Sequence, residues 1–287
     1  MEKFSGLIGV DLGATNVRSA RIENGSIIHL ESAPILNTTE PNDLIHQLIT
    51  QLEKVVTSET KSIGIGVPSV VDPVRGIVYD VQNIPSWKEV PLASMLSDLF
   101  GISVYINNDA NCFALGEKYF GAGRNVNSMV GLILGTGFGS GLILNGKLYS
   151  DAHCGAGEVG MLPYKDSIFE HYCSGQFFER HYSEKGPEVY QKALKGDTES
   201  LRLFAEFGTH VGEGIKAVLY AYDPDLIVLG GSISSALHLF ENSMLEAVQD
   251  FAYTNVMQTL RIEVSQVEHA GVLGAAALAL DATLTTS

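Results

Sequence analysis

Four polar residues within the stretch Asn107–Asn111 lie where an apolar strand meets a helical pattern. The run Val104–Ile106 predicts a strand, and a helical pattern starts near Ala110. Asp109 could cap that helix by accepting hydrogen bonds from its first free N–H groups. A cap explains one polar residue rather than four, and ligands of α/β proteins bind at the carboxyl ends of strands. We therefore interpret this junction as a ligand site.

The chain also contains an internal repeat. Residues 7–28 read as an apolar strand, a glycine turn, a second strand, Asn-Gly and a third strand, and residues 130–149 repeat that plan. Asn24-Gly25 and Asn145-Gly146 lie between alternating apolar runs, which is a strong signal for a β-hairpin. Two unrelated hairpins are common in general, but here the order and the spacing match in both copies. The repeat therefore favours a duplicated unit.

Corresponding glycine turns of the two copies have a composition suited to phosphate. Gly13-Ala14-Thr15 in the first copy matches Gly135-Thr136-Gly137 in the second, and we expect residues 135–139 as a whole to form tight turns. Glycine lets backbone N–H groups approach phosphate oxygens closely, and the threonine hydroxyls add donors. One such turn is more often only a turn. Two in equivalent positions favour a polyphosphate held between two domains.

Asp11 lies within the apolar strand sequence IGVDLG. An ionised carboxylate there costs free energy unless another group compensates for it. Mg²⁺ would do so, because this ion prefers one or two carboxylates together with water and phosphate oxygens. The alternative is a hydrogen-bonded aspartate of a turn. Next to Gly13 and Thr15, we favour the metal-linked role, with Mg²⁺ held through water.

Composition restricts the class of protein. The 287 residues are 45% hydrophobic and carry a formal net charge of −15, which disfavours nucleic acid and anionic membrane as partners and favours a small polar substrate. No window approaches the roughly 18 apolar residues of a membrane span, and residues 1–4 do not open a signal peptide. Three cysteines give no disulfide framework, which suits the cytoplasm.

The remaining pattern predicts α/β segments after each hairpin pair. Residues 40–57 and 199–222 have helical apolar spacing, and strands follow at SIGIGVPSVV and LIVLGG. A small-residue helix is expected over 270–280. We predict two α/β domains with a cleft between them: residues 1–110, joined by the C-terminal helix at about 271–287, and residues 111–270.

The ordered set of motifs resembles the ROK family of sugar kinases and repressors. The motifs are GVDLGATNVRSARIENG, INNDANCFALGE, LGTGFGSGLILNGKLY, CGAGEVGML and FEHYCSG, and PDLIVLGGSIS and GVLGAAA extend the match to about Ala279. The resemblance implies a duplicated actin-like, ribonuclease-H-like α/β fold with two lobes. It also implies ATP- and Mg²⁺-dependent phosphorylation of the 6-hydroxyl of a hexose. The sugar expected first is glucose, and N-acetylglucosamine or N-acetylmannosamine are further candidates.

The resemblance assigns roles to the matching residues. Asp109 would be the catalytic base. Sugar hydroxyls would be bound by Asn83, Asn108, Glu158 and Glu170, with Ser69 in a loop near the sugar. The phosphates and Mg²⁺ would lie along Asp11, Gly13, Thr15 and Asn16 in one lobe and along Gly135, Thr136 and Gly137 in the other. Gly230 and Gly231 would line the adenosine pocket.

The sequence departs from the family pattern after Gly160. Met161 occupies the usual His position, and only residues 162–169 separate it from Glu170, so the family's Cys-rich zinc loop is absent. His153, Cys154, His171 and Cys173 lack the usual ligand spacing, and we expect no zinc. A thioether accepts hydrogen bonds weakly and donates none. Met161 therefore implies either weaker discrimination around C1 and C2 of the sugar or room for a 2-N-acetyl group.

Other functions compete with a kinase. A sugar-responsive ROK regulator would carry a helix-turn-helix module, for which we expect no room before the strand that begins by Leu7. A sugar-binding protein without catalysis would not need Asp109, and an actin-like filament former would not need the polar sugar residues. Fructokinase-type specificity is a further alternative. The expected partners are a sugar and ATP, with no nucleic acid and no membrane, and a homodimer is compatible with the sequence.

Overall fold

The computed structural model describes residues 2–13, 15–36, 40–79, 87–149 and 155–285, which form two compact units. Unit 1 comprises Met1–Asn127, Gly141–Ala156 and Gln266–Ser287, and unit 2 comprises Ser128–Ser140 and Gly157–Ser265. This division differs from the domains predicted from sequence, which begin the second domain at residue 111. The helix that follows Asn108 belongs to unit 1, because it packs against the C-terminal helix.

The first sheet has the strand order β3-β2-β1-β4-β8. Its strands are β1 (Leu7–Leu12), β2 (Asn16–Glu23), β3 (Ser26–Pro34), β4 (Ser62–Val67) and β8 (Ser103–Asn108). The first three strands pair antiparallel, and β4 and β8 continue the sheet in parallel with β1. The predicted strands of this half are confirmed with two differences: SIGIGVPSVV divides into β4 and β5 (Val70–Asp72), which belongs to a separate sheet, and β8 continues through Asn108. The carboxyl ends of β1 and β8 emerge at the same edge of the sheet.

The second sheet repeats this order as β11-β10-β9-β14-β15. Its strands are β9 (Met129–Leu134), β10 (Phe138–Leu144), β11 (Lys147–Leu148), β14 (Leu226–Gly230) and β15 (Arg261–Val264). Here too the hairpin pairs antiparallel, whereas β9, β14 and β15 run parallel. The duplicated α/β fold expected from the repeat is therefore confirmed at the level of strand order.

The two Asn-Gly turns adopt the conformation that their sequence predicts. Asn24 and Gly25 have φ of 52° and 81°, and Asn145 and Gly146 have φ of 55° and 78°. Positive φ at both central positions defines the type I′ turn, whose twist matches that of the adjoining strands. The same local chemistry thus closes the corresponding hairpin in each copy.

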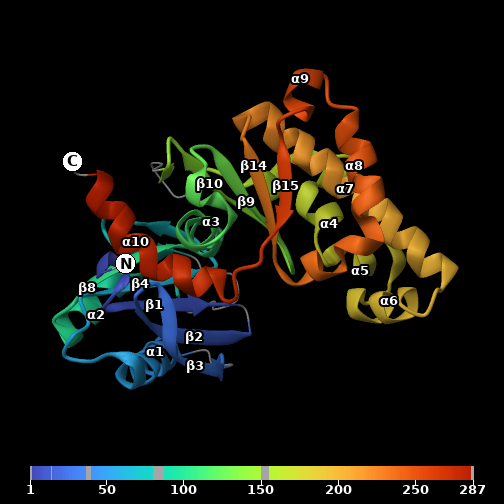
Figure 1. Cartoon of the computed structure of the whole chain (residues 1–287). Coiled ribbons are helices and arrows are strands. Elements are labelled where there is room, and N and C mark those ends of the chain that lie inside the picture. Colours follow the sequence, from blue (N-terminus) through green and yellow to red (C-terminus); the bar gives the residue numbers. More distant parts are fainter. Residues whose placement is uncertain (1, 14, 37–39, 80–86, 150–154, 286–287) are drawn as a thin grey trace. The chain divides into compact units, whose positions relative to one another are not determined.

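The helices follow the predicted periodicity. The segment predicted at 40–57 forms α1 (Pro41–Val55), the one at 199–222 forms α7 (Thr198–Tyr222), and α10 (Ala270–Thr285) extends beyond the expected 270–280. Figure 1 shows α7 packed beside α8 (Leu237–Gln249). Within the described ranges, no helix is both long enough and apolar enough to cross a bilayer.

The smaller elements complete the chain. Unit 1 also contains α2 (Leu92–Phe100), α3 (Asp109–Phe120), the short helices η1 (Glu2–Phe4) and η2 (Ala122–Asn125), and a sheet of β5 (Val70–Asp72), β6 (Ile77–Tyr79) and β7 (Glu89–Val90). Unit 2 also contains η3 (Val159–Met161), the hairpin β12 (Pro163–Tyr164) and β13 (Ser167–Ile168), α4 (Phe169–Cys173), α5 (Gln176–Tyr182), α6 (Gly186–Ala193), η4 (Ser232–Ala236) and α9 (Thr254–Met257).

Helix α10 packs on unit 1 at the distance of backbone contact. A Cβ atom added at Gly64 of β4 would lie 1.8 Å from the carbonyl oxygen of Ala275, and one added at Gly274 would lie 1.6 Å from that of Cys112 in α3. Only hydrogen fits at these positions. The small-residue composition of α10 therefore lets one helix contact β1, β4 and α3 together (Figure 1).

We expect Gly64→Ala to destabilise the protein by at least about 2 kcal/mol, because the added methyl group overpacks a rigid backbone contact. Urea unfolding followed by circular dichroism measures this change. Gly155→Ala is the matched control, since nothing lies within 4 Å of the Cβ atom that it adds. Equal unfolding midpoints for the two variants would contradict the packing described here.

Candidate active site

The polar junction between β8 and α3 contains a helix cap and a buried pair of asparagines. Helix α3 begins at Asp109, and its N-cap is Asn108, whose Oδ1 accepts a hydrogen bond of 2.8 Å from the N–H of Ala110. The Oδ1 of Asp109 also accepts from that N–H, at 2.9 Å. The capping role considered for Asp109 therefore falls mainly on Asn108, one residue earlier.

Asn107 and Asn111 hold the junction together. Both are buried, and Oδ1 of Asn107 accepts hydrogen bonds from Nδ2 of Asn111 at 2.9 Å and from the N–H of Asn108 at 2.8 Å. Asn108 and Asp109 are only half-buried. Two of the four polar residues are thus committed to the fold, and the two that reach the surface are those predicted to act on a ligand.

Ser69 holds the side chain of Asn108. Its carbonyl oxygen accepts a hydrogen bond of 3.3 Å from Nδ2 of Asn108, and its hydroxyl donates to the carbonyl oxygen of Tyr79. Ser69 was expected to lie near the sugar; its hydroxyl is here bonded to backbone, so that its contribution would be to position Asn108. Asn83, the further predicted sugar contact, lies outside the described residues.

The first glycine turn joins β1 to β2. The N–H of Gly13 donates to the carbonyl oxygen of Asn16 at 3.0 Å, which closes the turn. Thr15 is exposed, and its Oγ1 accepts a hydrogen bond of 3.0 Å from Nδ2 of Asn16. Ala14 lies outside the described residues. The three described residues of this predicted phosphate site therefore lie together at the end of β1.

Asp11 has protein partners for its charge. Nη1 of Arg18, directly across from it on β2, lies 3.4 Å from Oδ2, and the first turn of α10 approaches so closely that a Cβ at Gly271 would lie 3.7 Å from both carboxylate oxygens. Burial raises the pKa of Asp11, while Arg18 and His269 oppose that rise. Arg18 is therefore a protein partner for this carboxylate, as in the alternative of a hydrogen-bonded aspartate.

The donor set still fits Mg²⁺ held through water. A single half-buried carboxylate beside a phosphate turn is what this ion uses when phosphate oxygens and water complete its shell. Among the described residues, no group of three or more His, Cys, Asp or Glu side chains is arranged as a metal site. Asp11 would thus serve a nucleotide-bound cation and would not form a cation site by itself.

The second glycine turn is tied to Glu170. The N–H of Gly135 donates to the carbonyl oxygen of Gly137 at 3.0 Å, and Oε2 of Glu170 accepts from the N–H of Phe138 at 3.2 Å. A Cβ at Gly137 would lie 2.8 Å from the same Oε2, so a larger residue here would require the Glu170 carboxylate to shift. Thr136 is exposed, as is Thr15 in the first turn. The turn ends at Gly137, because Gly139 already lies within β10.

Glu158 lies near Glu170. It directly precedes η3, and although its side chain is exposed, partial desolvation raises its pKa, with the negative charge of Glu170 acting in the same direction. Two carboxylates close to one another are well suited to accept hydrogen bonds from the hydroxyls of a sugar. The structure therefore places these two predicted sugar contacts together on unit 2, and Asn108 with Asp109 on unit 1.

A cavity of about 510 Å³ opens beside the second glycine turn, entirely within unit 2. Its walls include Phe178, Tyr190 and Phe204, with Gly135 and Thr136 among its lining residues. Gly230 and Gly231 were predicted to line an adenosine pocket, but neither is among the residues that line this cavity. The nearest lining residue along the chain is Ser232. Gly231 instead packs on Leu134 of β9. The aromatic residues come from three different helices, and no local sequence signal marks them.

The four side chains considered for zinc do not form a described cluster. Nδ1 of His171 is hydrogen-bonded to Oγ of Ser167 at 2.5 Å, and the buried Sγ of Cys173 donates to the carbonyl oxygen of His210 at 3.1 Å. Burial raises the pKa of the Cys173 thiol well above its usual value. His153 and Cys154 lie outside the described residues.

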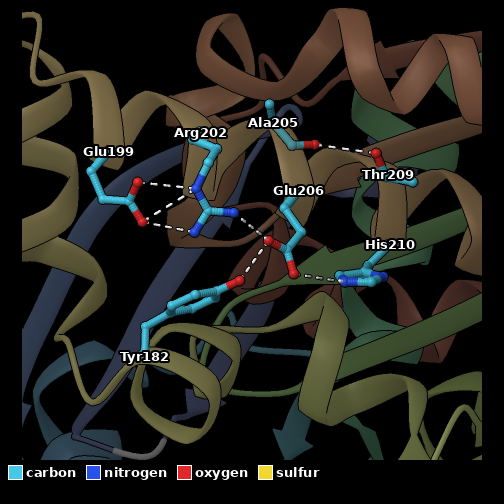
Figure 2. Close-up of polar contacts among 7 residues, drawn as sticks. All are labelled: Tyr182, Glu199, Arg202, Ala205, Glu206, Thr209 and His210. Carbon is cyan, nitrogen blue, oxygen red and sulfur yellow. Dashed lines mark hydrogen bonds and ion pairs between the residues drawn. The ribbon is translucent and has the colours of Figure 1, made fainter.

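A buried histidine contacts Tyr164 of the hairpin β12–β13, and no pattern in the sequence indicated it. His210 in α7 is 3% exposed, and its Nδ1 is 3.0 Å from the hydroxyl of Tyr164. Figure 2 shows its Nε2 facing Glu206, 3.8 Å away, while Glu206 also accepts hydrogen bonds from Arg202 at 3.0 Å and from Tyr182 at 2.5 Å. With Tyr164 donating to Nδ1, the proton of neutral His210 lies on Nε2 and faces a carboxylate.

Comparison with known proteins gives consistent matches over nearly the whole chain. The model of the ROK family matches residues 7–282. The chain is 30% identical to a glucokinase of Thermotoga maritima, covering 95% of this chain and 96% of that protein, and 30% identical to an N-acetyl-D-glucosamine kinase of Haemophilus influenzae, covering 95% and 98%.

Two further matches bear on function and fold. A xylose repressor of Caldicellulosiruptor bescii is 27% identical over 96% of this chain and 78% of the repressor. The crystal structure of a ROK family glucokinase from Streptomyces griseus, in complex with glucose and AMPPNP, superposes with a TM-score of 0.80 at 23% identity, covering 95% of this chain and 98% of that one. This likeness confirms the duplicated actin-like fold.

Protonation of His210 should make stability depend on pH in a defined window. Burial lowers the pKa of His210 to about 4, and Lys165 acts in the same direction. The unfolded chain, with an ordinary histidine pKa of about 6.5, binds more protons than the fold between these values, so stability falls as pH drops below about 6.5. Between pH 7.5 and 5.5, this one group should cost about 1 kcal/mol.

Urea unfolding at the two pH values, above the isoelectric point of about 4.8, measures this loss. The expected result is a smaller loss in His210→Phe than in the wild type, by about 1 kcal/mol. The control is His46→Phe, which replaces an exposed histidine of α1 and should keep the wild-type loss. Identical pH dependence in His210→Phe and the wild type would show that His210 does not titrate in this window.

Proposed function

The chain belongs to the ROK family, and on that premise we propose that it is an ATP-dependent kinase that phosphorylates the 6-hydroxyl of a hexose, with glucose as its first candidate substrate. The observation that carries the proposal is the second glycine turn, which opens onto the aromatic-walled cavity of about 510 Å³. That volume suits a nucleoside, whose phosphates would then extend along Gly135 and Thr136. The proposed partners are the sugar and ATP, and the proposed location is the cytoplasm, where ATP is available.

The chemistry of the cavity supports a nucleotide as phosphate donor. A nucleobase gains free energy by stacking on rings such as Phe178, Tyr190 and Phe204. An inorganic polyphosphate would instead need several basic side chains, and Lys185 is the one lysine or arginine among the described lining residues. The formal net charge of −15 disfavours a long polyanion still further.

The reaction would use Asp109 as proton acceptor. An alcohol is a poor nucleophile at neutral pH, and phosphoryl transfer depends mainly on positioning and on neutralisation of charge. Asp109 would take the hydroxyl proton as the new O–P bond forms, while Asn108, held by Ser69, would fix the sugar. Mg²⁺ bound with the nucleotide would neutralise phosphate charge, and Asp11 would hold it through water. Asn108 and Asp109 are adjacent at the N-terminus of α3, so the conformation of this helix end would position both side chains.

A sugar-responsive regulator is the second candidate, because the match to the xylose repressor covers 96% of this chain. Such a protein would bind a sugar and release no ADP. A coupled assay of ADP release from ATP, with and without hexose, separates the two functions. Release that depends on hexose supports a kinase, whereas sugar binding without release supports a regulator.

Asp109→Ala should leave the fold intact and lower kcat by about 10²–10⁴-fold, the usual contribution of a general base. The coupled ADP assay with glucose measures kcat, and circular dichroism checks the fold. Asp98→Ala, in the exposed part of α2, is the control and should retain wild-type kcat. Near-wild-type turnover in Asp109→Ala would remove the proposed catalytic role.

Met161 should govern discrimination at C1 and C2 of the sugar. It is 57% exposed and ends η3, three residues after Glu158, where its thioether cannot replace the hydrogen bonds of an imidazole. We expect kcat/KM for glucose, N-acetylglucosamine and N-acetylmannosamine to agree within about tenfold in the wild type.

Met161→His should shift the kcat/KM ratio towards glucose by about tenfold, because a regained hydrogen bond is worth about 1 kcal/mol or more. Leu162→His makes the same substitution one residue later and should leave the ratio unchanged. The ADP assay run over the three sugars measures all ratios. Strict rejection of both amino sugars by the wild type would contradict the proposal for Met161.

A further inference from the structure

Glu170 connects two regions of unit 2 that the proposed function assigns to different ligands. Its Oε2 accepts from the N–H of Phe138 at the end of the glycine turn, at 3.2 Å, and its Oε1 accepts from Nε2 of Gln176 at 3.0 Å. A carboxylate offers about four lone-pair directions, so two remain for sugar hydroxyls. A sugar bound at Glu170 would therefore share one carboxylate with the turn that is proposed to hold phosphates.

Gln176 completes this connection. Its Nε2 lies 3.0 Å from Oε1 of Glu170 and 3.4 Å from the carbonyl oxygen of Thr136, and it is one of the lining residues of the cavity. Its Oε1 accepts a hydrogen bond of 3.1 Å from Nε of Arg180. A guanidinium can only donate, so this bond fixes which end of the amide faces Glu170. The amide of Gln176 therefore contacts Glu170, the proposed sugar-binding carboxylate, and Thr136 of the second glycine turn. Gln176 also lines the cavity that is proposed to hold the nucleotide.

Hydrogen bonds connect this bridge to the turn. Oε2 of Glu170 accepts from the N–H of Phe138 at 3.2 Å, and the N–H of Gly175, directly before Gln176, donates to the carbonyl oxygen of Gly135 at 2.8 Å. A shift of the Glu170 carboxylate would therefore change its hydrogen bond to the turn. Holding that carboxylate with sugar hydroxyls would order the turn before a nucleotide arrives.

We propose that Gln176 is a positioning residue through which a sugar on Glu170 and a nucleotide on the Gly135–Gly137 turn strengthen each other's binding. The inference rests on the proposed function, since it takes the sugar and the nucleotide as the two ligands. A ligand that orders the turn first reduces the ordering cost for the second ligand, which gives positive coupling without any contact between the two. The coupling is reciprocal: each ligand raises the affinity of the other by the same factor.

Isothermal titration calorimetry tests the coupling. The Kd of Mg·AMPPNP is measured with and without saturating glucose, and the Kd of glucose with and without saturating Mg·AMPPNP. In the wild type, we expect each ligand to lower the Kd of the other by at least about fivefold, the lower end of ordinary allosteric coupling. In Gln176→Leu, similar in size but without polar atoms, the ratio should fall to within about twofold of one.

Two further variants separate coupling from structure. Arg180→Met removes the donor that orients the amide and should reduce the coupling ratio while Gln176 remains, so it replaces Gln176→Leu should the latter fail to fold. Arg261→Met is the control, because it breaks an exposed ion pair with Glu263 on β15 of the same unit and should keep the wild-type ratio. A general loss of stability would weaken both Kd values and leave their ratio unchanged.

The outcomes distinguish this inference from the function on which it rests. A wild-type ratio of one, with both ligands bound, overturns the inference and leaves the kinase proposal standing. A ratio that persists unchanged in Gln176→Leu and Arg180→Met overturns the role of Gln176 alone. Absence of any glucose or amino-sugar binding, together with absence of hexose-dependent ADP release, overturns the proposed function and this inference with it.

Discussion

The close approach of α10 to β1, β4 and α3 is the constraint on which unit 1 depends. No side chain beyond hydrogen fits at Gly64 or Gly274, so backbone rests on backbone, and interiors packed at this density do not adapt to added volume. Strand β1 carries Asp11 into the first glycine turn, and α3 begins with Asp109. One helix–sheet contact therefore fixes the elements that bear the proposed metal carboxylate and the proposed base.

The two glycine turns contact different charged residues, although the two sheets have the same strand order. At the first turn, the carboxylate of Asp11 is paired with Arg18 across the hairpin and approached by the first turn of α10. At the second, Glu170 comes from α4, outside the hairpin, and binds the backbone N–H of Phe138. The first turn thus combines a local ion pair with a contact from α10, whereas the second is bonded to Glu170, a predicted sugar contact that is distant in sequence.

The hairpin Pro163–Ile168 is held by aromatic packing where the family pattern has a cysteine-rich loop. The rings of Tyr164 and Phe169 stack with centroids 4.3 Å apart, and Tyr164 also meets His210 edge-on. Stacked and edge-to-face rings contribute stabilisation beyond their buried area. The hydrogen bond between Tyr164 and His210 ties the hairpin to α7, on which Glu206 accepts hydrogen bonds from Arg202 and Tyr182 (Figure 2).

Local chemistry in the sequence was enough to predict most strands of the two five-stranded sheets, both Asn-Gly hairpins and the two glycine turns, because each depends on residues within a few positions of one another. The match between residues 7–28 and 130–149 predicted the duplication, whereas β15 and the short strands β6, β7, β12 and β13 were not predicted. Local chemistry also marked Asn108 and Asp109 as candidate site residues, since polar residues at a strand end are a local signal. What the sequence could not decide was partnership across space. Arg18 pairs with Asp11, Asn108 is the N-cap of α3, and Glu170 binds the second turn through Phe138 and Gln176. Those pairings, like the cavity walls drawn from three helices, exist only once separate elements pack, because tertiary contacts and not neighbours along the chain bring these atoms together.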